Sequence, residues 1–235
     1  MNFVVLPTFN EKDNIGEIVL GILGLELGIK IIVVDDNSFD GTKEILKKLA
    51  EEFPQDLEVL YKDKKRGLGS SYIKAFKHIL SSHADVDSII TMDADLSHDP
   101  RHLPELLKES VNYDFIIGSR YIKGISVVNW PLGRLVLSIF ANRLVKLMLG
   151  IPINDVTSGF VCYTKKALGE IGLEGIKSDN YAFQIEMKYK LYKNGLSFKE
   201  IPIVFVERRY GESKLGKKDI FKTMLSVLGM RIWGN

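Results

Sequence analysis

The motif Asp93-Ala94-Asp95 is the segment of this sequence whose residue types and spacing most directly indicate chemistry. It follows a predicted strand over residues 88–92, and alternate residues at a strand end can direct two carboxylates toward one site. Two nearby carboxylates repel each other unless a cation lies between them, and a hard divalent ion prefers carboxylate and phosphate oxygens. Taken alone, the two aspartates could instead cap the next helix and contact solvent. The other acidic residues expected at the same edge of the sheet favour a divalent metal site.

A second acidic pair, Asp35-Asp36, follows an apolar strand predicted over residues 30–34. A carboxylate at this position can accept hydrogen bonds from a ribose or a base, as acidic residues do in dinucleotide-binding folds. Helix capping is the alternative role. Ser38, Asp40 or Thr42 could supply that cap instead, so the pair indicates a nucleotide contact.

The segment Lys64-Lys65-Arg66-Gly67-Leu68-Gly69-Ser70 is a basic, glycine-containing loop before a helix predicted over residues 69–80. Helix N-termini and bare glycine backbones favour anions, so this loop is expected to contact phosphate. It is not a dinucleotide fingerprint, because Tyr72 stands where a third small residue is needed.

The segment Gly211-Glu212-Ser213-Lys214-Leu215-Gly216-Lys217 has Walker A spacing, but Lys218 replaces the required Ser or Thr.

Basic residues of the second half are further candidates for binding phosphate. They are Arg120, Arg134, Arg208, Arg209, Lys214, Lys217 and Lys218. Arginine forks match phosphate oxygens bidentately. Arg120 directly follows a strand predicted over residues 115–118 and therefore belongs to the expected active edge. Lys217 and Lys218 are expected to be solvated surface charges.

Other kinds of site find little support in the sequence. His98 and His102 have the spacing of two ligands on one helical face, but the glutamate that a metalloprotease needs is missing between them. Both are expected to be loop or surface residues. The single cysteine, Cys162, excludes a disulfide framework and a multi-cysteine zinc site. A net charge of +2 excludes a protein that coats polyanions.

Strands alternate with helices along the first half of the chain. Strands are predicted over residues 2–6, 30–34, 57–61, 88–92 and 115–118, with helices over 15–24, 42–53, 69–80 and 104–111. This alternation predicts a mostly parallel sheet covered by helices on both faces. Ligands of such sheets bind beyond the carboxyl ends of the strands, where the acidic clusters at 7–11, 35–36 and 93–95 lie.

The second half is less regular. Helices are predicted over residues 132–149, 181–191 and 219–233, with a strand over 197–207 that Pro202 interrupts. The first and last of these helices carry an apolar stripe together with Arg or Lys. Such a stripe either packs on the core, which is the more common outcome, or lies in a membrane interface. No segment is apolar enough to span a bilayer, and the N-terminus is not a signal peptide.

The ordered set of motifs resembles family 2 glycosyltransferases with the GT-A fold, and among them polyprenyl-phosphate (dolichyl-phosphate) mannose synthases. The segments that carry the resemblance run through most of the chain. They are 6–11 (LPTFNE), 33–38 (VVDDNS), 40–42 (DGT), 66–69 (RGLG), 92–98 (MDADLSH), 118–121 (GSRY), 157–160 (TSGF) and 207–214 (ERRYGESK).

The resemblance implies one GT-A domain over residues 1–235, with a nucleotide-sugar-binding half at 1–120, an acceptor-binding half at 121–235 and no transmembrane domain. It implies a GDP-mannose site at Pro7, Thr8, Asn10, Glu11, Val34, Asp36, Ser38, Lys65, Gly67, Asp93, Ala94 and Asp95. It implies acceptor-phosphate contacts at Arg120, Arg134, Ser158, Arg208, Ser213 and Lys214. Mg2+ or Mn2+ is implied at Asp93, Asp95 and Ser97, and the implied catalytic residues are Asp95, Arg120 and Arg208.

Two positions depart from the pattern of the family. Ser97 stands where many relatives carry a glutamine that helps to hold the metal, and Val161 stands where many carry a basic residue.

The activity that the resemblance implies is inverting transfer of mannose from GDP-mannose to a polyprenyl (dolichyl) monophosphate. The implied location is the cytoplasmic face of a membrane, as a peripheral protein that binds no nucleic acid. Glucose transfer from UDP-glucose to the same lipid, or a non-catalytic binding protein of this fold, are the alternatives.

Overall fold

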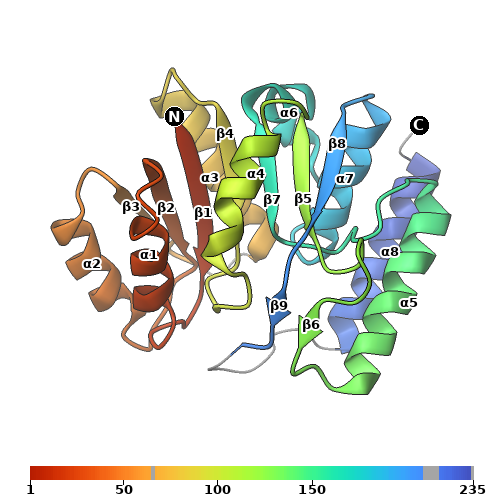
Figure 1. Ribbon diagram of the computed structural model, residues 1–235, viewed down its shortest axis with the longest axis horizontal. Coiled ribbons are helices and arrows are strands. Elements are labelled where there is room, and N and C mark those ends of the chain that lie inside the picture. Colours follow the sequence, from red (N-terminus) through yellow and green to blue (C-terminus); the bar gives the residue numbers. More distant parts are fainter. Residues whose placement is uncertain (65–66, 209–216, 234–235) are drawn as a thin grey trace.

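The computed structural model describes residues 1–64, 67–208 and 217–233 (Figure 1). Its main sheet has seven strands in the order β3-β2-β1-β4-β7-β5-β8. Their bounds are β1 Asn2–Thr8, β2 Ile29–Asp35, β3 Leu57–Tyr61, β4 Ser88–Thr91, β5 Phe115–Ser119, β7 Val161–Thr164 and β8 Phe198–Pro202. Only β7 runs antiparallel to its neighbours within this sheet, so the expectation of a mostly parallel sheet is confirmed.

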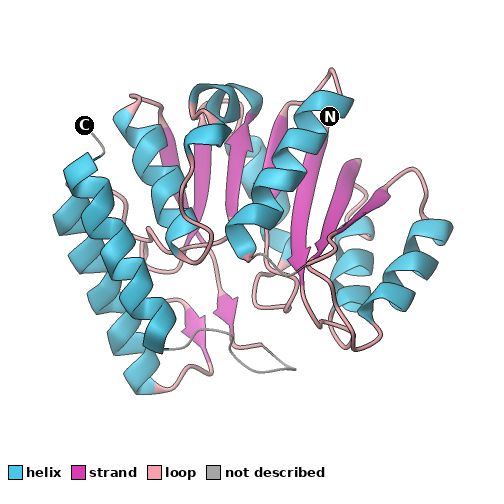
Figure 2. Cartoon of the chain, turned by 180° about the vertical axis from the view of Figure 1, so that it is seen from behind, coloured by secondary structure: helices cyan, strands magenta, loops and turns pink. Residues whose placement is uncertain are grey.

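Helices cover both faces of the sheet (Figures 1 and 2). Their bounds are α1 Ile15–Leu23, α2 Thr42–Glu52, α3 Leu68–Ser82, α4 Leu103–Glu109, α5 Leu132–Leu149, α6 Lys165–Glu170, α7 Ala182–Lys193 and α8 Lys217–Trp233. Successive side chains of a strand point to opposite faces. In β1, Phe3 and Val5 join the core under α3 and α7, whereas Val4 and Leu6 join the core under α1 and α4. This arrangement explains why the strands are apolar at nearly every position.

The expected strand over residues 197–207 is two separate strands in the structure. β8 ends at Pro202, and β9 (Phe205–Val206) pairs with β6 (Val127–Val128) in a small second sheet. Proline lacks the N–H that would continue the ladder, which accounts for the break. The strand β7 and the helix α6 that follows it were not predicted from the sequence.

Helices α5 and α8 lie side by side at one end of the molecule (Figures 1 and 2). Val145 and Leu149 of α5 and Val227 of α8 are buried against the protein. The other side of α5 exposes large apolar residues, of which Phe140 is 62% and Leu147 is 81% exposed. Core packing therefore uses only part of each apolar surface. In the part of the chain that the structure describes, no helix is both long and apolar enough to cross a bilayer.

Candidate active site

The carboxyl ends of three neighbouring parallel strands form one acidic edge. β2, β1 and β4 are adjacent in the sheet, so the segments that follow them meet at the same side. A cavity of about 450 Å³ opens there. Its acidic wall is formed by Glu11, Asp36, Asp93 and Asp95. The structure thus brings together the clusters that sequence spacing placed at one edge.

The cavity contains many of the expected site residues, but not all of them. Those that line it are Pro7, Thr8, Glu11, Asp36, Gly67, Asp93, Ala94, Asp95 and Arg208. Leu68, of the expected loop, also lines it, and the lining residues that sequence reasoning missed are Phe9, Ser71, Asp179, Asn180 and Tyr181. Expected residues placed behind or beside this lining are Asn10, Val34, Ser38, Ser97, Arg120, Arg134 and Ser158. Lys65, Ser213 and Lys214 lie outside the described residues, as do Arg66 and Arg209.

Asn10 and Ser38 join the two loops that form the floor of the cavity. The backbone N–H of Asn10 donates to the Ser38 hydroxyl at 2.9 Å, and the N–H of Phe39 donates to the Asn10 side-chain oxygen at 3.0 Å. Asn10 adopts a φ of 54°, a left-handed conformation that asparagine tolerates better than most residues. Val34 is fully buried in the core. These three residues therefore shape the site from behind its surface.

Asp36 is held in place by a buried ion pair. The Lys62 ammonium lies 2.7 Å from Asp36 Oδ1, and both side chains are only 7% exposed. The backbone N–H of Gly67 donates to the other carboxylate oxygen at 3.1 Å. Since β2 and β3 are neighbours, this pair fixes the loop after β3 against the end of β2.

The N-terminus of α3 binds a carboxylate of the protein itself, that of Asp179. The backbone N–H of Ser70 donates to Asp179 Oδ1 at 2.8 Å. A Cβ at Gly67 would lie 2.5 Å from the Asp179 carbonyl oxygen, and the φ of Gly67 is +102°. Glycine is required here for close backbone approach and for this conformation. The glycines of this loop contact the segment before α7, and Gly67 also lines the cavity.

Asp93 and Asp95 are the residues that fit a divalent cation. Desolvation in the cleft and the neighbouring Asp95 carboxylate raise the pKa of Asp93 to about 7. The side chain of Asp93 is 36% exposed, so an ion can reach it. Ser97 donates its hydroxyl to Asp95 Oδ1 at 2.5 Å, which orients that carboxylate. Within the described residues no three His, Cys, Asp or Glu side chains converge as a metal site, so a cation here would need further oxygen ligands from substrate or water.

His98 lies in the loop after β4, as expected, but it is buried beneath this motif and not at the surface. It is 2% exposed, stacks on Phe160 at a ring distance of 5.0 Å, and accepts a hydrogen bond from the Asp93 N–H at 3.1 Å. Burial lowers the pKa of His98 to about 4, so it is neutral and its Nδ1 can act as an acceptor. His98 thus supports the backbone of Asp93. The sequence signal that could have indicated this role is the position of His98, three residues after Asp95.

The three expected arginines have different surroundings. Arg208 lies at the cavity, with its guanidinium 3.2 Å from Asp95 Oδ2. Arg134 forms an ion pair with Glu207 and lies over the Trp130 ring at 4.2 Å. Glu207 also approaches Arg208 at 3.8 Å, so a chain of alternating charges leads from the start of α5 to Asp95.

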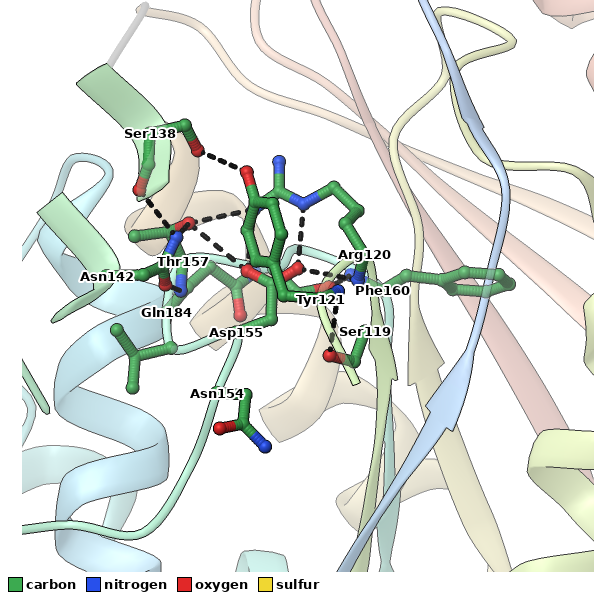
Figure 3. A network of polar contacts seen from close by, with 12 residues as sticks. Ser119, Arg120, Tyr121, Ser138, Asn142, Asn154, Asp155, Thr157, Phe160 and Gln184 are labelled. Carbon is green, nitrogen blue, oxygen red and sulfur yellow. Dashed lines mark hydrogen bonds and ion pairs between the residues drawn. The ribbon is translucent and has the colours of Figure 1, made fainter. Parts of the chain in front are cut away.

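Arg120 belongs to a buried polar network next to the cavity (Figure 3). It is 8% exposed, and its Nε and Nη2 donate to the two oxygens of Asp155 at 2.7 and 2.6 Å. The charge of Arg120 lowers the pKa of Asp155 against the opposing effect of its burial. Asp155 was not expected from the sequence, because its partner lies 35 positions away. The Ser158 hydroxyl donates to the Gly118 carbonyl oxygen at 2.6 Å, which connects the loop of Ser158 to the end of β5, next to Arg120.

Comparison with known proteins places this architecture in a family. The family model "Glycosyl transferase family 2" matches residues 3–172. A polyprenol monophosphomannose synthase of Mycolicibacterium smegmatis is 38% identical over 98% of this chain and 87% of its own length. An undecaprenyl-phosphate mannosyltransferase of Micrococcus luteus is 37% identical over 95% of this chain and 90% of its own length.

Solved structures agree with the expected GT-A fold. Glucosyl-3-phosphoglycerate synthase of Mycobacterium tuberculosis, solved with Mn2+, uridine diphosphate and glucosyl-3-phosphoglycerate, superposes with a TM-score of 0.69. It is 18% identical, and the match covers 97% of this chain and 80% of that one. At 18% sequence identity, this similarity shows the fold alone. Together with the family match and the curated relatives, it shows that the chain belongs to glycosyltransferase family 2.

Proposed function

We propose that this glycosyltransferase moves mannose from GDP-mannose to a polyprenyl monophosphate, with inversion at the anomeric carbon and with Mg2+ or Mn2+ as cofactor. The observation that carries the proposal is the Asp93/Asp95 pair beside Arg208 in a cavity at the ends of β1, β2 and β4. The names of the two mannosyltransferase relatives support the sugar and the lipid class.

In this proposal the first half of the chain, residues 1–120, binds the donor. Glu11 and Asp36 face the cavity from the ends of β1 and β2, where they can accept hydrogen bonds from the nucleoside. Asp93 and Asp95 would hold the divalent ion, whose charge would offset the negative charge that develops on the leaving diphosphate. Ser97 and His98 keep these carboxylates and their backbone in place, through the contacts described above.

The second half, residues 121–235, would bind the acceptor phosphate together with Arg120. A phosphate monoester has a second pKa near ~6, so much of the acceptor is dianionic at neutral pH and needs no strong base. The protein then has to hold the two reactants in line, which can contribute roughly 7–11 kcal/mol. The position of Arg208 at the cavity supports this role, and we extend the proposal to Arg134, Ser158, Ser213 and Lys214.

We also propose that the protein works at the surface of a membrane, on the cytoplasmic side, where a polyprenyl chain can be reached. The exposed apolar side of α5 is the surface for this contact. Leu147→Glu should reduce flotation with vesicles that contain anionic lipid, because it places a charge in the apolar interface. Val111→Glu is the matched control, because Val111 is 84% exposed, close to the 81% of Leu147, but follows α4. Equal flotation of both variants and the wild type would exclude this surface.

The direct test is a panel of radiolabelled nucleotide sugars incubated with polyprenyl phosphate and Mn2+ or Mg2+, followed by lipid extraction. Label from GDP-mannose should enter the lipid fraction, and chelation of the metal should stop it. Label from UDP-glucose instead would replace the donor in this proposal with the alternative sugar. No lipid-bound label from any donor would refute the polyprenyl-phosphate assignment.

A further inference from the structure

Thr157 joins three partners through one hydroxyl group. Its Oγ1 accepts from Arg120 Nη2 at 2.8 Å and from Asn142 Nδ2 at 3.1 Å, and it donates to Asp155 Oδ1 at 3.3 Å (Figure 3). A hydroxyl offers one donor and two acceptor sites, so every hydrogen-bonding site of Thr157 is used. The side chain is half-buried beside the guanidinium of Arg120.

The partner Asn142 belongs to α5, the helix with the exposed apolar side. Asn142 is itself 3% exposed, and its side-chain oxygen accepts from the Thr157 N–H at 3.2 Å. Asn142 therefore contacts both the backbone and the side chain of Thr157. A second contact from the same helix pairs Ser138 with the hydroxyl of Tyr121 at 2.7 Å. A displacement of α5 would move the residues around Arg120.

The hydrogen bonds of Arg120 determine which part of it remains for a ligand. Nε and Nη2 are used by Asp155 and Thr157. Among the described residues, Nη1 has no hydrogen-bond partner. A guanidinium is planar, so fixing two of its nitrogens also fixes the direction of the third. Asp155 binds both of these nitrogens, and the charge-assisted hydrogen bond to Thr157 reinforces the orientation that this pair gives.

We propose that Thr157 is a positioning residue that couples helix α5 to Arg120 and thereby sets the orientation of the guanidinium toward the acceptor phosphate. The effect on the acceptor rests on the proposed function, whereas the orientation of Arg120 can be measured without substrate. In this arrangement, the helix that would meet the lipid surface and the arginine that would meet the lipid phosphate move together.

The test compares Thr157→Val, which removes the hydroxyl at nearly constant shape, with Thr157→Ser, which keeps it. Thr157→Val should raise the KM for polyprenyl phosphate about tenfold, the effect of one lost charge-assisted contact, with an unchanged Kd for GDP. Thr157→Ser should stay near the wild-type values. Ser88→Ala is the control for stability alone, because it removes a buried hydroxyl bonded to Asn2 at the opposite end of the sheet.

The coupling to α5 is tested by a double-mutant cycle with Asn142→Leu. Asn142→Leu removes both contacts with Thr157, so the double variant should show about the same KM as Asn142→Leu alone. Additive effects would overturn the coupling. Equal losses in acceptor KM and in GDP binding, or an acceptor KM in Thr157→Val equal to that of the wild type, would overturn the positioning role.

A readout without substrate separates this inference from the proposed function. The 15N-detected Nη2–Hη signals of Arg120, the group that donates to Thr157, should exchange with solvent slowly in the wild type and in Thr157→Ser, and markedly faster in Thr157→Val. Unchanged exchange in Thr157→Val would refute the positioning role, whatever the substrate. If exchange changes as expected but the wild type transfers no sugar to polyprenyl phosphate, only the proposed function fails.

Discussion

Lys188 should make the stability of the protein depend on pH in the range from pH 7 to 9. This lysine of α7 is fully buried, and its ammonium group donates to the carbonyl oxygens of Val156, Ser158 and Gln184 at 3.2, 2.7 and 3.1 Å. Burial lowers the pKa of Lys188 to about 7, from an ordinary value of 10.5. Two of its three acceptors lie in the loop that carries Thr157, so the lysine supports that loop.

The sign of the effect follows from proton linkage. Below pH 7 the lysine is protonated in the folded and unfolded states, so it contributes no slope. Between pH 7 and 10.5 the folded state gives up its proton first, the unfolded state binds more protons, and the free energy of unfolding rises with pH. When the unfolded state binds one proton more than the folded state, the free energy of unfolding rises by about 1.4 kcal/mol per pH unit. From pH 7 to 9 the rise due to Lys188 should be roughly 2 kcal/mol.

The assay is urea denaturation of the wild type and Lys188→Met at pH 7, 8 and 9. Methionine keeps most of the length of the side chain but removes the amine, so the difference between the two proteins isolates the titration of Lys188. Lys193→Met is the control variant, because Lys193 is exposed at the end of the same helix. A wild-type slope equal to that of Lys188→Met would show that the lysine keeps its charge in the core, and would refute the reasoning.

Three further predictions concern the cavity. Gly67→Ala should destabilise the fold by about 2 kcal/mol in urea denaturation, because the added Cβ would lie 2.5 Å from the Asp179 carbonyl oxygen and Gly67 has a φ of +102°. Gly16→Ala is the control and should stabilise the fold slightly, because nothing lies within 4 Å of its Cβ. Asp36→Asn should lower the free energy of unfolding by about 3 kcal/mol, because it leaves the buried ammonium of Lys62 uncompensated, and Lys62→Met in the same chain should restore part of the loss. Asp95→Ala should abolish turnover and weaken Mn2+ binding measured by electron paramagnetic resonance; near-normal values in both assays would contradict the metal assignment.

Periodicity in the sequence was sufficient to predict most of the first half of the fold. Strands over residues 30–34 and 57–61 appear in the structure within one residue at each end, as β2 and β3. Apolar runs of this kind reflect burial on both faces, which is a property of each strand by itself. The short strand β7 has no such signal, and its antiparallel insertion between β4 and β5 depends on its neighbours.

Residue types and their distance from strand ends were enough to locate the acidic edge of the site. The contacts that hold this edge in place were not visible, because they join residues far apart in the chain. Ser70 and Asp179 are separated by 109 positions, and nothing near either residue indicates the other. The close approach of Asp179 to Gly67 was therefore not visible from the sequence.

The sequence alone determined that carboxylates follow β1, β2 and β4, and hence that they meet at one edge, because the order of strand, helix and strand decides where the ends of parallel strands lie. Only the tertiary structure decided what each charged group touches. Arg120 is bound by Asp155, and His98 is buried under Asp93. These pairings depend on how helices and loops pack on the sheet, and packing of side chains between distant segments leaves no local pattern in the sequence.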